Sequence, residues 1–121
     1  MNKISIIGAG AFGFAMAKII GEGHPDKEIF IFDVQKEHIA HIKNTRKHPI
    51  FHKNTEISKH ITVTHSLKNT INDSNFIVLA VPSKFMRSAI KDLRQFLTRE
   101  VILLNIAKGL ENGTNMMMHQ V

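Results

Sequence analysis

The amino-acid sequence predicts an α/β domain built on a doubly wound parallel sheet. Apolar runs at residues 3–7, 28–32 and 75–81 alternate with segments whose apolar residues recur at helical spacing, which is typical of strand–helix–strand units. The 28–32 run is apolar on both faces, as expected of a central parallel strand. With a short strand at 61–64 and a further strand at 101–105, we expect a five-stranded sheet in the order 3-2-1-4-5.

Helices are expected between these strands. The first covers about residues 11–20, because two glycines follow it and glycine favours helix ends. The second covers residues 35–44 and turns Ile39 and Ile42 inward, and a single helical turn follows at 66–70. These segments would cover both faces of the sheet.

The fourth strand is broken by Pro82, and Ser83 is expected to cap the next helix. The stretch at 45–60 is polar and irregular, and a long loop in a compact domain is usually functional or mobile. Near the end of the chain, Thr114 could cap a short helix. The helix after Ser83 carries an apolar stripe at helical spacing: Phe85, Met86, Ala89, Ile90, Leu93, Phe96 and Leu97.

A glycine turn after the first strand has the pattern Gly8-x-Gly10-x-x-Gly13, and Asp33 follows twenty positions later. This is the dinucleotide-binding fingerprint of a Rossmann domain. Gly8 permits a tight turn, Gly10 lets backbone amides approach a pyrophosphate, and Gly13 lets the helix pack on the strand. The pyrophosphate would lie at the positive end of the helix starting near Ala11. Asp33 would bind the adenine ribose, or cap the following helix, or do both.

Composition excludes several other classes of protein. The chain has 121 residues, which suits one domain, and it has no cysteine, so disulfides, zinc thiolate sites and cysteine nucleophiles are excluded. No apolar run approaches the roughly 20 residues that span a membrane. Residues 1–3 lead directly into the first strand and leave no room for a signal peptide. We therefore expect a cytoplasmic protein.

Neither nucleic acid nor metal is expected as a ligand. The formal net charge is +6, but the basic residues are dispersed and the chain has neither Trp nor Tyr, so no stacking platform accompanies them. Two histidine pairs, His38 with His41 and His48 with His52, lack a third ligand at a recognisable spacing. No serine–histidine–acid order or pair of carboxylates stands out.

Three segments, taken together, resemble NAD(P)-dependent glycerol-3-phosphate dehydrogenase. They are residues 8–13 (GAGAFG), 80–85 (AVPSKF) and 105–111 (NIAKGLE). Their order and spacing are similar to those of the N-terminal domain of that family, over residues 4–121. The resemblance implies the NAD-binding domain of an oxidoreductase. NADP is also possible as the cofactor. Such an enzyme interconverts dihydroxyacetone phosphate and glycerol 3-phosphate by hydride transfer, in glycerol-3-phosphate metabolism and phospholipid biosynthesis.

The resemblance also implies roles for individual residues. Ala11 and Phe12 would lie over the cofactor diphosphate, and Phe85 would pack near the nicotinamide, although a place in the core is equally open to it. Lys108 would reach both the cofactor and the phosphorylated substrate. In the family, a second lysine and an aspartate from a C-terminal domain supply the proton-transfer chemistry, and this sequence has no counterpart of either.

Two departures from the family pattern affect these assignments. The family usually has Ser at position 11 and Trp or Tyr at position 12, so Ala11 removes a hydroxyl donor and Phe12 keeps only a ring. The family's Tyr-Leu-Pro element in the long loop is degraded here to residues 49–52, Pro-Ile-Phe-His. A contact between this loop and the cofactor is therefore in doubt.

We expect residues 1–121 to form a dinucleotide-binding domain whose substrate domain is absent. NADH should bind better than NADPH, because Asp33 repels a 2′-phosphate, although Lys36 could partly compensate. The open edge of the fifth strand should favour a homodimer. Two alternatives remain: a non-catalytic NAD(H)-sensing module, and a related dehydrogenase such as ketopantoate reductase or 6-phosphogluconate dehydrogenase.

Overall fold

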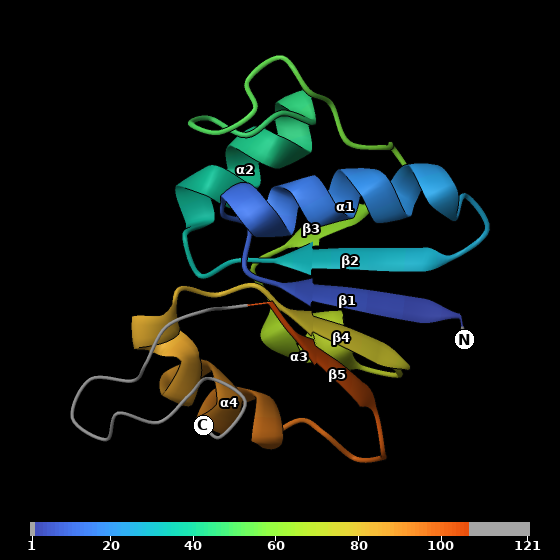
Figure 1. Ribbon diagram of the computed structural model, residues 1–121, viewed down its shortest axis with the longest axis vertical. Helices are drawn as coiled ribbons and strands as arrows, with labels where there is room; N and C mark the ends of the chain where they lie inside the picture. Colours follow the sequence, from blue (N-terminus) through green and yellow to red (C-terminus); the bar gives the residue numbers. More distant parts are fainter. Residues whose placement is uncertain (1, 107–121) are drawn as a thin grey trace.

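The protein forms a five-stranded parallel sheet in the order β3-β2-β1-β4-β5. This computed structural model describes residues 2–106 (Figure 1). The doubly wound sheet predicted from the sequence is confirmed, including its strand order. Its elements are β1 (Lys3–Ile7), α1 (Ala11–Gly23), β2 (Glu28–Phe32), α2 (Lys36–Thr45), β3 (Thr62–Thr64), α3 (Leu67–Ile71), β4 (Phe76–Leu79), the 3₁₀ turn η1 (Ser83–Phe85), α4 (Met86–Arg94) and β5 (Ile102–Asn105).

Helices cover both faces of the sheet. Figure 1 shows α1 and α2 on one side and α3 and α4 on the other. Because successive strand residues point to opposite faces, Ile6 joins the core under α1 and α2 while Ile7 joins the core under α3 and α4. The predicted inward residues of α2, Ile39 and Ile42, are buried as expected. Two hydrophobic cores therefore hold the central strands from both sides.

One expected helix end and two possible helix caps differ in the structure, and α2 lies one residue later than expected at each end. Helix α1 continues through Gly23, because Gly21 does not stop it but packs so closely that an added Cβ would lie 2.7 Å from Ile61 Cδ1. Ser83 does not cap the next helix, since it begins the turn η1, and neither η1 nor α4 has a side-chain cap. Asp33 does not cap α2 directly, because the N-cap residue of α2 is Gln35.

The expected third, fourth and fifth strands were too long. Strand β4 ends at Leu79, where its register with β1 and β5 ends as well. Strands β3 and β5 each begin one residue later than expected, although Ile61, just before β3, is buried. The long loop before β3 and the turn α3, capped by Ser66, are as expected.

Strand β1 carries buried polar side chains that tie it to α3. Lys3 Nζ donates hydrogen bonds to the carbonyls of Asn69 and Asn72, and its ammonium lies 4.0 Å from the centroid of the Phe30 ring. Burial lowers the pKa of Lys3 from its ordinary value. Ser5, which is fully buried, donates its hydroxyl to the Thr70 carbonyl at 2.5 Å.

Replacing Ser5 by alanine should lower the free energy of unfolding by about 1–3 kcal/mol, because the substitution removes a hydrogen bond to a buried carbonyl. Urea unfolding followed by circular dichroism measures this change. The matched control is Ser88→Ala, on the exposed side of α4, which should change stability by less than about 0.5 kcal/mol. Equal stability of both variants would show that the Ser5 contact contributes nothing.

Candidate cofactor site

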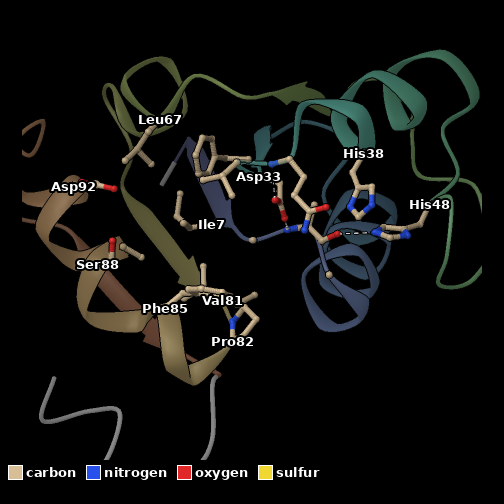
Figure 2. Close-up of a pocket in the computed structure, with 18 of the residues that line it drawn as sticks. Ile7, Asp33, His38, His48, Leu67, Val81, Pro82, Phe85, Ser88 and Asp92 are labelled. Carbon is tan, nitrogen blue, oxygen red and sulfur yellow. Dashed lines mark hydrogen bonds between the residues drawn. The ribbon is translucent and has the colours of Figure 1, made fainter. Parts of the chain in front are cut away.

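A cavity of about 410 Å³ lies at the carboxyl ends of β1, β2 and β4. Ligands of open α/β sheets bind at this edge, where the strand order reverses. Figure 2 shows Asp33 and His38 on one side of the cavity and Phe85, Val81 and Pro82 on the other. Its size is within the range of small-molecule pockets.

The glycine turn between β1 and α1 is closely packed at two of its glycines. Gly8 has φ +110°, and an added Cβ would lie 2.7 Å from the Ala80 carbonyl oxygen. At Gly13 an added Cβ would lie 1.7 Å from the carbonyl oxygen of Gly8. Both positions thus require glycine, one for its backbone angle and both for space. These contacts agree with the structural roles expected from the sequence.

Gly10 differs from the other two glycines, because an added Cβ would meet no atom within 4 Å. It is the N-cap residue of α1, where no side chain of residues 2–106 caps the helix and the first turn holds no acidic residue. The helix begins at Ala11, as expected, and Phe12 in the first turn is 62% exposed. The positive end of α1 therefore faces open space beside the cavity, which suits an anionic group.

Asp33 lies at the end of β2 and holds the glycine turn. Its Oδ2 accepts the Ala9 N–H at 2.8 Å, and its Oδ1 accepts the Gln35 N–H at 3.0 Å. Each carboxylate oxygen can accept more than one hydrogen bond, so these contacts leave acceptor capacity toward the cavity. Asp33 is thus placed at the end of the cavity where the fingerprint puts the ribose.

His48 is buried in the cavity wall and contacts the glycine turn through Ala9. Its Nε2 lies 2.8 Å from the Ala9 carbonyl oxygen, and its Nδ1 accepts the N–H groups of Ile50 and Phe51 at 3.0 and 3.1 Å. The His48 ring also packs edge-on against Phe14 of α1. The peptide unit of Ala9 is consequently held by Asp33 at its N–H and by His48 at its carbonyl.

A second cavity of about 310 Å³ adjoins the first and shares Gly10, Phe51, Ala80, Val81 and Pro82 with it. The sequence put a contact from the degraded loop element at 49–52 in doubt, but the structure places Phe51 in the walls of both cavities. The walls of the second cavity also include the first turn of α1, the start of η1 and the residue after β5: Ala11, Phe12, Ser83 and Ile106.

Phe85 is not a core residue, since it is 53% exposed and lines the larger cavity. Of its two open assignments, the structure thus supports a place at the site. Ser88 and Asp92 line the same wall and were missed, although their spacing from Phe85 puts them on one helical face. Leu67, at the start of α3, and His48, in the long loop, were also missed as wall residues, because only the fold brings these segments to this edge.

Some expectations fall on residues outside the part of the chain that the structure describes. Lys108, the 107–111 part of the third motif and Thr114 lie outside the described residues. Within residues 2–106, no three His, Asp or Glu side chains gather as a metal site would require. In that same part of the chain, no helix is long and apolar enough to cross a membrane.

Comparison with known families decides among the dehydrogenases that share this glycine turn. The family described as NAD-dependent glycerol-3-phosphate dehydrogenase N-terminus matches residues 3–121. The chain belongs to this family. The resemblance carried by the three sequence motifs is thereby confirmed, and the family differs from ketopantoate reductase and 6-phosphogluconate dehydrogenase.

Relatives and solved structures agree with this assignment. A glycerol-3-phosphate dehydrogenase [NAD(P)+] of Clostridium perfringens is 34% identical over the whole chain, which covers 36% of that protein. Its counterpart in Acholeplasma laidlawii is 38% identical over 93% of the chain and 32% of the relative. The fold is that of a glycerol-3-phosphate dehydrogenase of Coxiella burnetii, with a TM-score of 0.90 at 18% identity over 98% of the chain and 36% of that structure. The chain spans about a third of the length of these relatives.

Proposed function

We propose that the chain binds NAD(H) as the cofactor-binding part of a glycerol-3-phosphate dehydrogenase. The observation that carries this proposal is the glycine turn, where Gly10 leaves open space at the N-terminus of α1. A pyrophosphate fits there because backbone N–H groups and the helix dipole both favour an anion. Membership of the family supports the same cofactor.

Each part of the cofactor has a place along the two cavities. The adenine ribose lies at Asp33, whose carboxylate accepts its hydroxyl hydrogens, and the diphosphate passes over Gly10, Ala11 and Phe12. The nicotinamide end extends past Phe85 toward the second cavity. Gly8 and Gly13 keep the turn in the shape that lets the cofactor approach.

We propose that the enzyme to which this domain contributes interconverts dihydroxyacetone phosphate and glycerol 3-phosphate. When bound, the nicotinamide supplies or accepts the hydride. The chain contributes position and charge, and we propose Lys108 as its contact to the phosphorylated substrate. Because the chain spans about a third of its relatives, the proton-transfer groups implied by the resemblance have no counterpart in it. We place the reaction in the cytoplasm, in glycerol-3-phosphate metabolism and phospholipid biosynthesis.

Calorimetric titration of the 121-residue chain with NADH should give a one-to-one binding isotherm, whereas added dihydroxyacetone phosphate should cause no steady NADH oxidation. Hydride transfer needs the substrate carbon held against the nicotinamide and an acid to protonate its oxygen. An absence of NADH binding would overturn the proposed function. Steady oxidation would show instead that the chain carries the whole reaction.

We also propose that the chain forms a homodimer through β5. This strand is at the edge of the sheet, and its Ile102, Leu103 and Leu104 are 54%, 46% and 40% exposed. An exposed apolar edge strand is a template for pairing with a second chain, and the net charge of +6 opposes open-ended growth.

Light scattering should give the mass of a dimer at high micromolar concentration, and Leu103→Lys should give a monomer, because a lysine on an edge strand opposes pairing. The matched control is Ile50→Lys, at a loop residue that is 55% exposed and distant in sequence from β5; it should remain dimeric. A monomer mass for the unmodified chain would reject this assembly.

A further inference from the structure

His48 has a hydrogen-bonding pattern that only the neutral imidazole can satisfy. Its Nδ1 accepts two backbone N–H groups, those of Ile50 and Phe51, so this nitrogen carries no proton. Its Nε2 faces the carbonyl oxygen of Ala9, which can only accept, so Nε2 carries the proton and donates it. The residue is 1% exposed.

These bonds join the two parts of the site that come from different regions of the sequence. Ala9 lies within the glycine turn, and its N–H is held by Asp33. Phe51 is in the long loop, its ring centroid lies 5.0 Å from that of His48, and it lines both cavities. Figure 2 shows the hydrogen bond from His48 to the glycine turn. His48 thus connects the turn that would receive the diphosphate to the loop that walls both cavities.

We propose that neutral His48 is a positioning residue for the cofactor, which holds the glycine turn and the Phe51 loop together, so that protonation of His48 weakens nucleotide binding. The inference rests on the proposed function. It adds a dependence on pH that the glycine fingerprint itself does not have. His48 acts through its hydrogen bond to Ala9 and its contacts with Phe51.

Protonation would put an N–H on Nδ1, directly opposite the two N–H donors that it now accepts. Both bonds would break, and the loop would separate from the imidazole ring. The charged groups around His48 are His38 and His41 on α2 and Asp33 at the end of β2, while α1 presents the uncharged ring of Phe14.

Three other basic residues of the same loop have partners of their own. Arg46 donates to the carbonyls of Ile61 and Lys59, and Lys47 pairs with Glu56. His52 stacks on the Phe14 ring, with ring centroids 6.4 Å apart. The groups that set the charge state of His48 are therefore those of α2 and β2.

Burial lowers the pKa of His48 below the ordinary value of 6.5, and His38 and His41 act in the same direction. The hydrogen bond to Ala9 and the charge of Asp33 raise this pKa without reversing the shift. The neutral form consequently predominates above pH 6.5, and the protonated form becomes the major one only at a pH below that value. The affinity for the nucleotide should fall over the same pH range in which His48 becomes protonated, because the nucleotide binds to the form with neutral His48.

The test is calorimetric titration of the 121-residue chain with NAD⁺, which is stable in acid, at pH values from about 8 to 5.5 over which the circular dichroism is unchanged. The affinity should be constant above pH 6.5 and should then fall by up to about tenfold per pH unit, the slope for uptake of one proton. A flat profile would overturn the inference.

Three variants separate His48 from its titrating neighbours. His48→Asn keeps an acceptor at the Nδ1 position and has no proton to gain, so it should bind NAD⁺ with a flat pH profile. His48→Leu removes both contacts and should bind at least about tenfold more weakly at pH 8, also without pH dependence. His38→Gln, the matched control, keeps His48 and should keep the fall, moved to higher pH because a neighbouring positive charge is gone.

The outcomes distinguish this inference from the proposed function. If the native chain and the His48→Asn variant show the same fall in affinity with decreasing pH, another group is responsible and the inference is wrong. If His38→Gln alone abolishes the fall, the titrating group is His38. If the native chain binds no NAD⁺ at pH 8, the proposed function fails and the inference fails with it, whereas binding with a flat profile contradicts the inference alone.

Discussion

Replacing Gly13 by alanine should prevent stable folding, whereas replacing Gly10 by alanine should leave the fold intact and abolish nucleotide binding. At Gly13 the new Cβ would lie 1.7 Å from a backbone oxygen of Gly8, so α1 would have to move off the turn. Overpacking typically costs about 1–3 kcal/mol, and a backbone clash exceeds that range. The expected loss is a large part of the roughly 5–15 kcal/mol that stabilises a domain.

At Gly10 the effect should be confined to binding. Its φ of −84° suits alanine, and no atom lies within 4 Å of the new Cβ. The methyl group would instead occupy the approach of the diphosphate, with an expected loss of affinity of tenfold or more, about 1.4 kcal/mol. Thermal unfolding and calorimetric titration measure the two effects separately.

Gly23→Ala is the matched control for both glycine variants. Gly23 ends α1 in open space, and alanine there should raise stability by up to about 1 kcal/mol without changing NADH affinity. Our account of the turn is wrong if Gly13→Ala is as stable as Gly23→Ala, or if Gly10→Ala binds NADH normally.

Asp33 should make the chain prefer NADH to NADPH by about tenfold or more, about 1.4 kcal/mol. The carboxylate accepts hydrogen bonds from the ribose hydroxyls, whereas a 2′-phosphate at that position would meet a like charge held in place by Ala9 and Gln35. Asp33→Asn keeps an acceptor oxygen and removes the charge, so the ratio of the two affinities should fall toward one. Parallel calorimetric titrations with the two cofactors measure this ratio.

The matched control for Asp33→Asn is Lys36→Gln, at the first residue of α2. If Lys36 partly compensates for the repulsion of a 2′-phosphate, its removal should weaken NADPH binding further and leave NADH binding unchanged. NADPH binding tenfold more tightly than NADH to the native chain would defeat the assignment of Asp33 as the discriminating residue.

The fold could be predicted from the sequence because its signals are local. The alternation of apolar runs with helical periods indicated every strand that the structure contains, and the glycine spacing indicated the turn before α1. Gly8 and Gly13 have the structural roles that their spacing predicted, as the positive φ of one and the close contacts of both show. Local chemistry is sufficient for such features.

The errors and omissions depend on contacts between distant segments. Gly21 looked like a helix stop because its packing against Ile61 is invisible in sequence. His48 looked like half of a weak metal pair, since its partner Ala9 is 39 positions away. Phe85 could not be assigned to core or site until α4 had a position on the sheet. Lys108 stays a prediction from the resemblance.

The most direct test of the central claim is to map the nucleotide onto the chain by NMR, from the amide shift changes that NADH causes. We predict that the largest changes fall on the glycine turn, at Gly10, Ala11 and Phe12, and on Asp33, with Phe51 following. Amides at the β3 edge of the sheet should be unaffected. Changes confined to the basic groove around Lys43, on the β3 edge, or no changes at all, would contradict the account.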